Sequence, residues 1–291
     1  MKRNIAIVAE DKAYAHELAA FFDENRYNSY VILVDRPCWT ALLSDGARTV
    51  VDKNDFSFFT DETWVKPDFA YIATHTYGSG GKLQGYFDLQ KIPYSSSNLL
   101  VSAISFNKFA CNQYLKGFGV RVPEGLVLKK GYEISAEDVA EKIGFPCFVK
   151  PNEGSDNAAV MKVDGKEGMW QAIANAFRYS DEVLIEPAVE GTEVECACYK
   201  TKKKEGLYLS VSLSEDVERR IRMLTSVIYD ILGCSGMVVI KYIVDIDNKI
   251  NLLRINATPR ITAEGFICRQ AIETGRDMKE VMTDIIENKF I

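Results

Sequence analysis

Leu252-Leu253-Arg254-Ile255-Asn256-Ala257-Thr258-Pro259-Arg260-Ile261-Thr262 is the stretch of this chain that decides its fold. Residues 252–256 alternate as a strand does, which places Arg254 and Asn256 on one face. A second apolar run at 237–244 carries Lys241 in its middle. A lone charge among apolar neighbours on the same face fits the wall of a binding site somewhat better than an open surface, but from these residues alone we favour an ordinary solvent-facing strand charge. The two runs predict a hairpin that presents two cations.

Composition is that of an ordinary globular protein. The 291 residues are 47% hydrophobic and 26% charged, with a formal net charge of −6. An acidic chain gives no reason to expect nucleic acid or an anionic membrane as a partner. No apolar run is long enough to span a membrane, and the run at 5–8 is too short for a signal peptide, so we expect a cytoplasmic protein.

Hydrophobic patterning divides the chain into strands and helices. Strands are expected at 4–9, 29–34 and 68–74, and helices at 13–25, 78–89 and 102–118. Strands separated by helical crossovers predict a parallel, doubly wound α/β sheet. A capping box begins a helix at Ser135, and a strongly amphipathic helix runs from Asp216 to a stop at Gly233.

Several short motifs share the order and spacing of one known family. They are His75-Thr76-Tyr77-Gly78, Ile92-Pro93-Tyr94-Ser95, Leu184-Ile185-Glu186, Gly191-Thr192-Glu193 and Asn256-Ala257-Thr258-Pro259. Each motif is weak alone. Together they resemble the D-alanine–D-alanine ligases of the ATP-grasp superfamily over nearly the whole chain. The resemblance implies an N-terminal doubly wound parallel sheet domain (1–98) and two α+β subdomains (99–185 and 186–291) that sandwich a nucleotide. It also implies a homodimer.

The resemblance assigns ATP a set of contacts. Lys108 and Lys150 match two lysines that reach the phosphates, and phosphates require fixed cations of this kind. The turn at 153–157 matches a flap whose backbone N–H groups cover the phosphates. A hinge that begins at Glu186 matches the segment that binds adenine, and Glu193 matches the acid that binds ribose. The full expected nucleotide set is Lys108, Lys150, Glu153, Ser155, Glu186, Val189, Glu193, Lys241, Arg254 and Asn256.

The metal positions depart from the family. The family holds magnesium with an Asp, a Glu and an Asn where this chain has Lys241, Arg254 and Asn256. Two magnesium ions with two carboxylates leave roughly two positive charges. Lys241 and Arg254 also carry about two. The site therefore keeps its attraction for a triphosphate, whereas magnesium is not expected, and a cation pair does not template the phosphoryl group as a metal does.

Catalytic residues are unassigned, with Glu17, His75 and Arg260 as candidates. Glu17 matches a carboxylate of the family's first helix, and His75 keeps the family's histidine position. An isolated histidine after a strand is more often a packing residue. Arg260 replaces a glycine, where its side chain fills the amino-acid subsite or binds a carboxylate.

The chain between residues 193 and 241 is too short for the closing loop of the family. A lid excludes water from an acyl-phosphate, so its absence promotes hydrolysis over ligation.

Three functional hypotheses follow. The leading one is a nucleotide-binding D-alanine–D-alanine ligase-like pseudoenzyme with degenerate metal and substrate sites and impaired ligation. The alternative is an active ATP-dependent carboxylate–amine ligase that acts through an acyl-phosphate. The third is a non-catalytic binding or regulatory protein. The expected ligands are ATP and a small amino acid or carboxylate.

Overall fold

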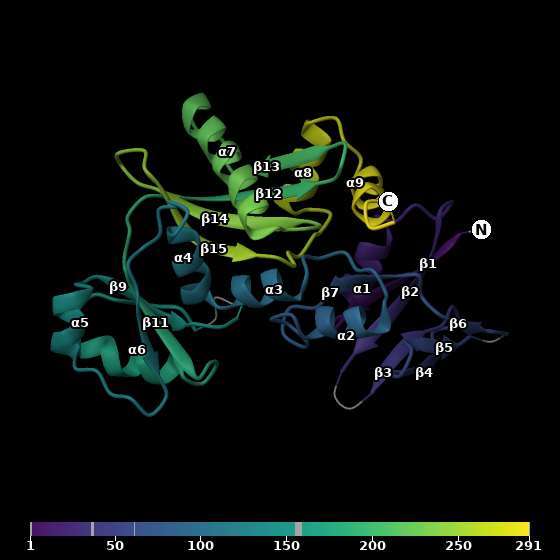
Figure 1. The fold of residues 1–291 in the computed structure, drawn as a ribbon, viewed down its shortest axis with the longest axis horizontal. Coiled ribbons are helices and arrows are strands. Elements are labelled where there is room, and N and C mark those ends of the chain that lie inside the picture. Colours follow the sequence, from purple (N-terminus) through teal and green to yellow (C-terminus); the bar gives the residue numbers. More distant parts are fainter. Residues whose placement is uncertain (1, 36–37, 61, 155–158, 291) are drawn as a thin grey trace. The chain divides into compact units, whose positions relative to one another are not determined.

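The computed structural model describes residues 2–35, 38–60, 62–154 and 159–290, and its first sheet has seven strands (Figure 1). Their order is β6-β5-β4-β3-β2-β1-β7. The strands are β1 Arg3–Ala9, β2 Tyr27–Val34, β3 Trp39–Leu42, β4 Arg48–Asp52, β5 Ser57–Phe59, β6 Trp64–Val65 and β7 Phe69–Ala73. β1 lies parallel to both β2 and β7, which confirms the predicted parallel core. β3 to β6 extend it with antiparallel hairpins, so the sheet is mixed.

Helices cover both faces of this sheet, as a doubly wound arrangement requires. Ile5 and Ile7 of β1 pack in one core with α1, α8 and α9. Ala6 and Val8 point to the other face and pack in a second core with α2. The helices are α1 Lys12–Ala19, α2 Lys82–Gln90, α8 Phe266–Glu273 and α9 Met278–Glu287. A strand buried on both sides in this way reads as a continuous apolar run, which explains residues 5–9.

The second sheet is antiparallel, with the order β10-β9-β11-β8. Its strands are β8 Leu126–Lys129, β9 Cys147–Pro151, β10 Met161–Val163 and β11 Glu182–Pro187. α5 Ala136–Lys142, the 3-10 helix η1 Lys166–Gly168 and α6 Met169–Ala176 accompany it, and α5 and α6 share its core. The predicted capping box is confirmed, because the Ser135 and Asp138 side chains accept each other's backbone N–H.

The helix expected over 102–118 is two helices, α3 Leu99–Phe106 and α4 Lys108–Lys116. Asn107 lies between them in an extended conformation, and its side-chain oxygen accepts the Ala110 N–H at 2.9 Å. This is the behaviour of an N-cap asparagine, so the single-helix prediction was wrong at that residue.

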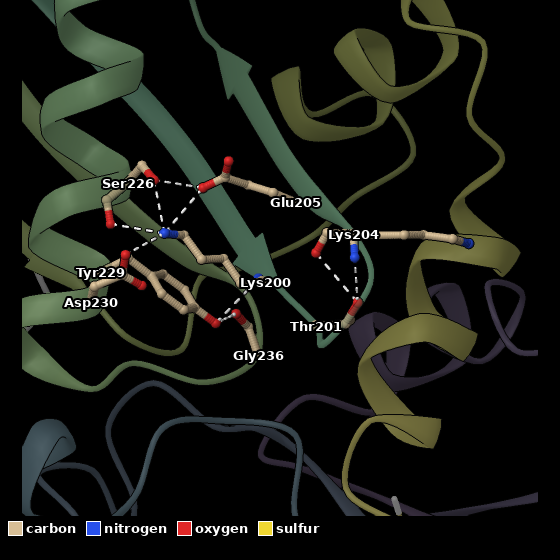
Figure 2. A network of polar contacts seen from close by, with 8 residues as sticks. All are labelled: Lys200, Thr201, Lys204, Glu205, Ser226, Tyr229, Asp230 and Gly236. Atoms are coloured by element: carbon tan, nitrogen blue, oxygen red, sulfur yellow. Dashed lines mark hydrogen bonds and ion pairs between the residues drawn. The ribbon is translucent and has the colours of Figure 1, made fainter.

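The third sheet has the order β13-β12-β14-β15, from β12 Thr192–Lys200, β13 Glu205–Leu209, β14 Val238–Val244 and β15 Ile250–Asn256. α7 Glu215–Leu232 ends at Gly233, whose φ of 68° lies in the left-handed region, as predicted. Figure 2 shows how the β12–β13 hairpin is tied to α7. Lys200 Nζ donates to the Ser226 hydroxyl at 2.7 Å and to the Asp230 carboxylate at 2.8 Å, and it pairs with Glu205 at 3.2 Å.

The chain forms two compact units that are both discontinuous in sequence. The first comprises Met1–Ser102, Cys196–Val239 and Ala257–Ile291, and the second comprises Ala103–Glu195 and Ile240–Asn256. The three subdomain boundaries expected from the resemblance stay a prediction. Within the described residues, no helix combines the length and the apolar content that crossing a membrane would need.

Candidate nucleotide and amino-acid sites

Lys108 begins α4 and lies at the base of the flap in the second unit. Its side chain is buried, with 7% of the residue exposed. Nζ donates to the carbonyl oxygen of Pro151 at 2.9 Å and to that of Gly154 at 2.8 Å. Pro151 is the last residue of β9, and Gly154 lies in the turn that follows it. Lys108 therefore joins α4 to the end of β9 and the start of this turn.

Two further cations, Lys150 and Arg254, lie near Lys108. Burial first, and then the neighbouring Lys150 and Arg254, lower the pKa of Lys108 to about 7, while Glu186 and Glu153 oppose the shift. Like charges disfavour one another's charged forms when they are close, so three predicted phosphate contacts share one neighbourhood. A bound polyphosphate would relieve this repulsion through charge-assisted hydrogen bonds.

Glu186 lies at the end of β11 with its carboxylate fully engaged. Lys150 forms an ion pair with it, and Asn112 Nδ2 donates to Oε1 at 3.0 Å. Only 3% of Glu186 is exposed, and a carboxylate buried this deeply needs such partners. Asn112 was not predicted from the sequence as a site residue. Its spacing of four residues after Lys108, on the same helix face, was the available signal.

Lys241 forms an ion pair with Glu193, with 19% of the lysine side chain exposed. The position that holds a metal ligand in the family is thus occupied by a cation that contacts the predicted ribose acid. Asn256, the last residue of β15, is half-buried. The pairing of Lys241 with Glu193 was not predicted.

Magnesium does not fit these residues. It requires oxygen ligands, usually carboxylates, in near-octahedral geometry. Lys241 and Arg254 carry only hydrogen-bond donors. Among the residues that the structure describes, no group of three or more His, Cys, Asp or Glu side chains could hold a metal ion.

A second cluster lies in the first unit, where β1 and β7 end at the same edge of the sheet. Glu10 follows β1, and its carboxylate accepts the Thr76 N–H at 3.0 Å, the Thr76 hydroxyl at 2.8 Å and the Tyr77 N–H. An open cavity of about 650 Å³ begins here and is lined by Glu10, Lys12, Thr76 and Tyr77 among others. Ligands of α/β sheets bind at this edge. Glu10 was not predicted as a site residue, although an acid directly after a buried parallel strand was a usable signal.

Arg260 is oriented by two residues at the start of α1. Its guanidinium lies 4.2 Å from the centre of the Tyr14 ring and 3.7 Å from the Asp11 carboxylate. Tyr14 in turn accepts the Ile261 N–H at 2.9 Å through its hydroxyl. Cation–π stacking of this kind holds an arginine in place while leaving donors for another anion.

The other two catalytic candidates lie in the same unit. Glu17 accepts the Ala263 N–H at 2.8 Å, three residues after Arg260. The His75 ring lies 5.8 Å from the Tyr14 ring. Burial lowers the pKa of His75, the positive Arg260 lowers it too, and Glu10 opposes them. His75 is therefore neutral at pH 7.

The remaining predicted positions fall as follows. Glu153 forms a bridge with Asn107 at the flap, and Val189 follows β11 in the hinge. Ser155 lies outside the described residues. The structure thus gathers Lys108, Lys150, Glu186 and Arg254 around one cluster in the second unit, and Lys241 with Glu193 in the same unit.

Comparison with known proteins gives concordant results. A family model described as "D-ala D-ala ligase C-terminus" matches residues 115–210 and 198–287. A D-alanine–D-alanine ligase of Phocaeicola vulgatus is 49% identical over 324 aligned residues that cover all of both chains. That alignment is 33 positions longer than the 291 residues of this chain. The two parts of the family match overlap at 198–210, a range that includes the end of β12 and all of β13.

Solved structures share the fold. The D-alanine–D-alanine ligase of Coxiella burnetii has a TM-score of 0.88 at 21% identity, covering 99% of this chain and 94% of its own. The D-alanine–D-alanine ligase of Bacillus anthracis, complexed with ATP, has a TM-score of 0.79 at 22% identity, covering 99% of this chain and 97% of its own.

Proposed function

Because this chain belongs to the D-alanine–D-alanine ligase family, we propose that it is an ATP-dependent carboxylate–amine ligase that joins D-alanine or a similar small amino acid. The observation that carries the proposal is identity of 49% over the full length of a relative that bears this name. The comparisons lend no support to the leading hypothesis of a pseudoenzyme, and they favour its active alternative.

ATP is the proposed nucleotide, and the second unit supplies its contacts. A related protein of the same fold is complexed with ATP. In this chain Lys108, Lys150 and Arg254 offer cations to the phosphates. The carboxylates of Glu186 and Glu193 are the acceptors proposed for the adenine amino group and the ribose hydroxyls. Each now pairs with a lysine, so nucleotide binding exchanges or shares those partners.

The first unit supplies the proposed amino-acid site. Arg260 carries a guanidinium fork suited to a carboxylate, and its orientation is set by Tyr14 and Asp11. Glu17 is the acid proposed to attract the ammonium group of the amino acid. Neutral His75 is suited to accept or donate a hydrogen bond without adding charge.

The proposed reaction has two steps. A carboxylate oxygen of the first amino acid attacks the γ-phosphorus of ATP, and the bond to the bridging oxygen breaks, giving an acyl-phosphate and ADP. The amine of the second amino acid then attacks the acyl carbon, loses a proton, and expels inorganic phosphate. Positioning and electrostatics supply most of the catalysis in phosphoryl transfer, which suits a site made of fixed cations.

A second candidate function is nucleotide binding without ligation. One observation favours it, namely that Lys241 pairs with Glu193 where the family places a metal ligand. The cytoplasmic location and the homodimer expected from the sequence also stay predictions.

Phosphate release tests both candidates. Purified protein is incubated with ATP and D-alanine, and phosphate and dipeptide are measured together, with the amino acid omitted as a control. Phosphate and dipeptide in equal amounts support the ligase. Phosphate without dipeptide indicates hydrolysis of the acyl-phosphate, and ATP binding without phosphate release supports the second candidate.

A further inference from the structure

We propose that this chain binds the free nucleoside triphosphate, so that magnesium weakens binding instead of enabling it. The inference deepens the proposed ATP site and rests on it, but it does not require ligation. It concerns cations of the second unit, namely the cation cluster of Lys108, Lys150 and Arg254, and Lys241, which pairs with Glu193.

The cluster contains a cation in a fixed position. Lys108 is buried, and its ammonium group is held by the backbone carbonyls of Pro151 and Gly154. Lys150 and Arg254 lie close enough to act on its charge. Cations that lie close together and are already held in place favour binding of a polyphosphate, because little ordering is left for the binding step.

The charge balance favours the free triphosphate over its metal complex. The carboxylates near Lys108 are Glu186, which is already paired with Lys150, and Glu153. Glu193 is already paired with Lys241. An ATP molecule without metal carries about four negative charges, and its magnesium complex about two. Attraction to the cluster therefore falls by roughly half when the metal is bound.

A metal ion would also meet direct repulsion. The family places magnesium at the positions of Lys241 and Arg254, and a divalent ion there would lie next to two unit charges of the same sign. Among the described residues no group of three or more His, Cys, Asp or Glu side chains could hold the ion, and the nearby Glu193 is already paired with Lys241. Since excess magnesium converts most ATP to its complex, added magnesium removes the preferred ligand and offers a poorer one.

Isothermal titration of ATP into the whole protein, with EDTA and then with magnesium in excess over ATP, tests the inference. We expect affinity at least about tenfold weaker with magnesium. Equal or tighter binding with magnesium overturns the inference, and so does the absence of any binding in EDTA. Inorganic tripolyphosphate serves as a second probe, and we expect it to compete with ATP in EDTA.

A charge-reversed variant sharpens the test. Lys241→Asp with Arg254→Glu restores two carboxylates, and we expect it to bind ATP only with magnesium. The matched control is Lys249→Glu, at an exposed residue that pairs with Asp247 in the β14–β15 turn, which leaves the preference for free ATP unchanged. Thermal unfolding verifies that each variant folds. If the double variant does not fold, the wild-type titrations alone still decide the matter.

Failure of this inference can be distinguished from failure of the proposed ligase function. Tighter binding in EDTA with no dipeptide supports the inference and overturns the ligase. Dipeptide formation that depends on magnesium, with tighter binding in its presence, supports the ligase and overturns the inference.

Discussion

Lys108 makes nucleotide affinity depend on pH in a way that can be calculated. The pKa of its ammonium group is about 7 in the free protein, because of burial and of the neighbouring Lys150 and Arg254. A bound triphosphate favours the charged form and raises that pKa. Affinity is therefore fully present below pH 7 and is lost as the pH rises from 7 toward the pKa of the complex.

The size of the loss follows from linkage. Between those two pKa values, each pH unit costs about 1.4 kcal/mol of binding free energy, which is a tenfold loss of affinity. From pH 7.5 to pH 9.5 we expect the dissociation constant for ATP to rise by up to ~100-fold. The terminal phosphate, with a second pKa of about 6, is fully ionised over this range and contributes no opposing change. Binding at pH 8 should also take up close to one proton.

Titrations in EDTA across this range, repeated in buffers of different ionisation enthalpy, measure both quantities. Lys108→Arg keeps a charge at every pH, so its affinity should be nearly independent of pH over the range. Lys108→Met should bind weakly throughout. A flat profile for the wild-type protein, or the same slope in Lys108→Arg, would refute the reasoning.

Three further changes test other parts of the molecule. Lys200→Met removes the donor that joins the β12–β13 hairpin to Asp230 of α7. Urea unfolding should show a free energy of unfolding lower by ~1–3 kcal/mol, with the affinity for ATP unchanged. An unaltered unfolding midpoint would mean that these ion pairs contribute nothing to stability. Arg260→Ala should raise the KM for D-alanine at least about tenfold while the ATP dissociation constant stays constant, and a change confined to ATP would argue against a carboxylate contact. Gly236→Ala should lower the free energy of unfolding by at least ~2 kcal/mol. The reason is that φ at Gly236 is +71° and the added Cβ would lie 1.7 Å from the Ser95 carbonyl oxygen. Stability equal to that of the wild-type protein would show that the backbone of this turn adapts.

The elements that the sequence predicted well are those with a strong local signal. α7 has apolar residues at helical spacing, and Gly233 can adopt the left-handed conformation that ends it. β1 is a short continuous apolar run, as a strand buried on both faces must be. In both cases, residues close in sequence determine the conformation.

The elements that could not be predicted from the sequence depend on contacts between residues far apart in the chain. α3 and α4 were predicted as one helix. The N-cap bond of Asn107 to Ala110 is local, but the break is also held by Asn152, whose side-chain amide donates to Asn107 at 3.0 Å and whose oxygen accepts the Phe109 N–H at 2.9 Å. β3 to β6 are two to five residues long, too short for a periodic pattern to be recognised.

The residues of the candidate site also fall into two groups, those that the sequence predicts and those that it does not. The positions of the cations could be read from the motifs, because motif spacing locates a residue along the chain. Their partners could not, since Glu193 beside Lys241 and Asn112 beside Glu186 are contacts between different elements. Motif spacing predicts where a residue lies along the chain, but it does not predict which acid or amide side chain will contact that residue in the folded protein.

The first unit is completely folded only when residues near the start of the chain contact residues near its end. Tyr27 donates to Glu287 of α9 across 260 residues at 2.8 Å, and Arg3 contacts the same carboxylate at 2.6 Å. At a synthesis rate of about 5–20 residues per second, roughly 13–50 seconds separate the emergence of these partners from a ribosome. The antiparallel sheet of β8 to β11 is complete long before α9 is made. During that interval the exposed face of β1 and β2 awaits its last helix, so a nascent chain of this protein should depend on chaperones until its final residues arrive.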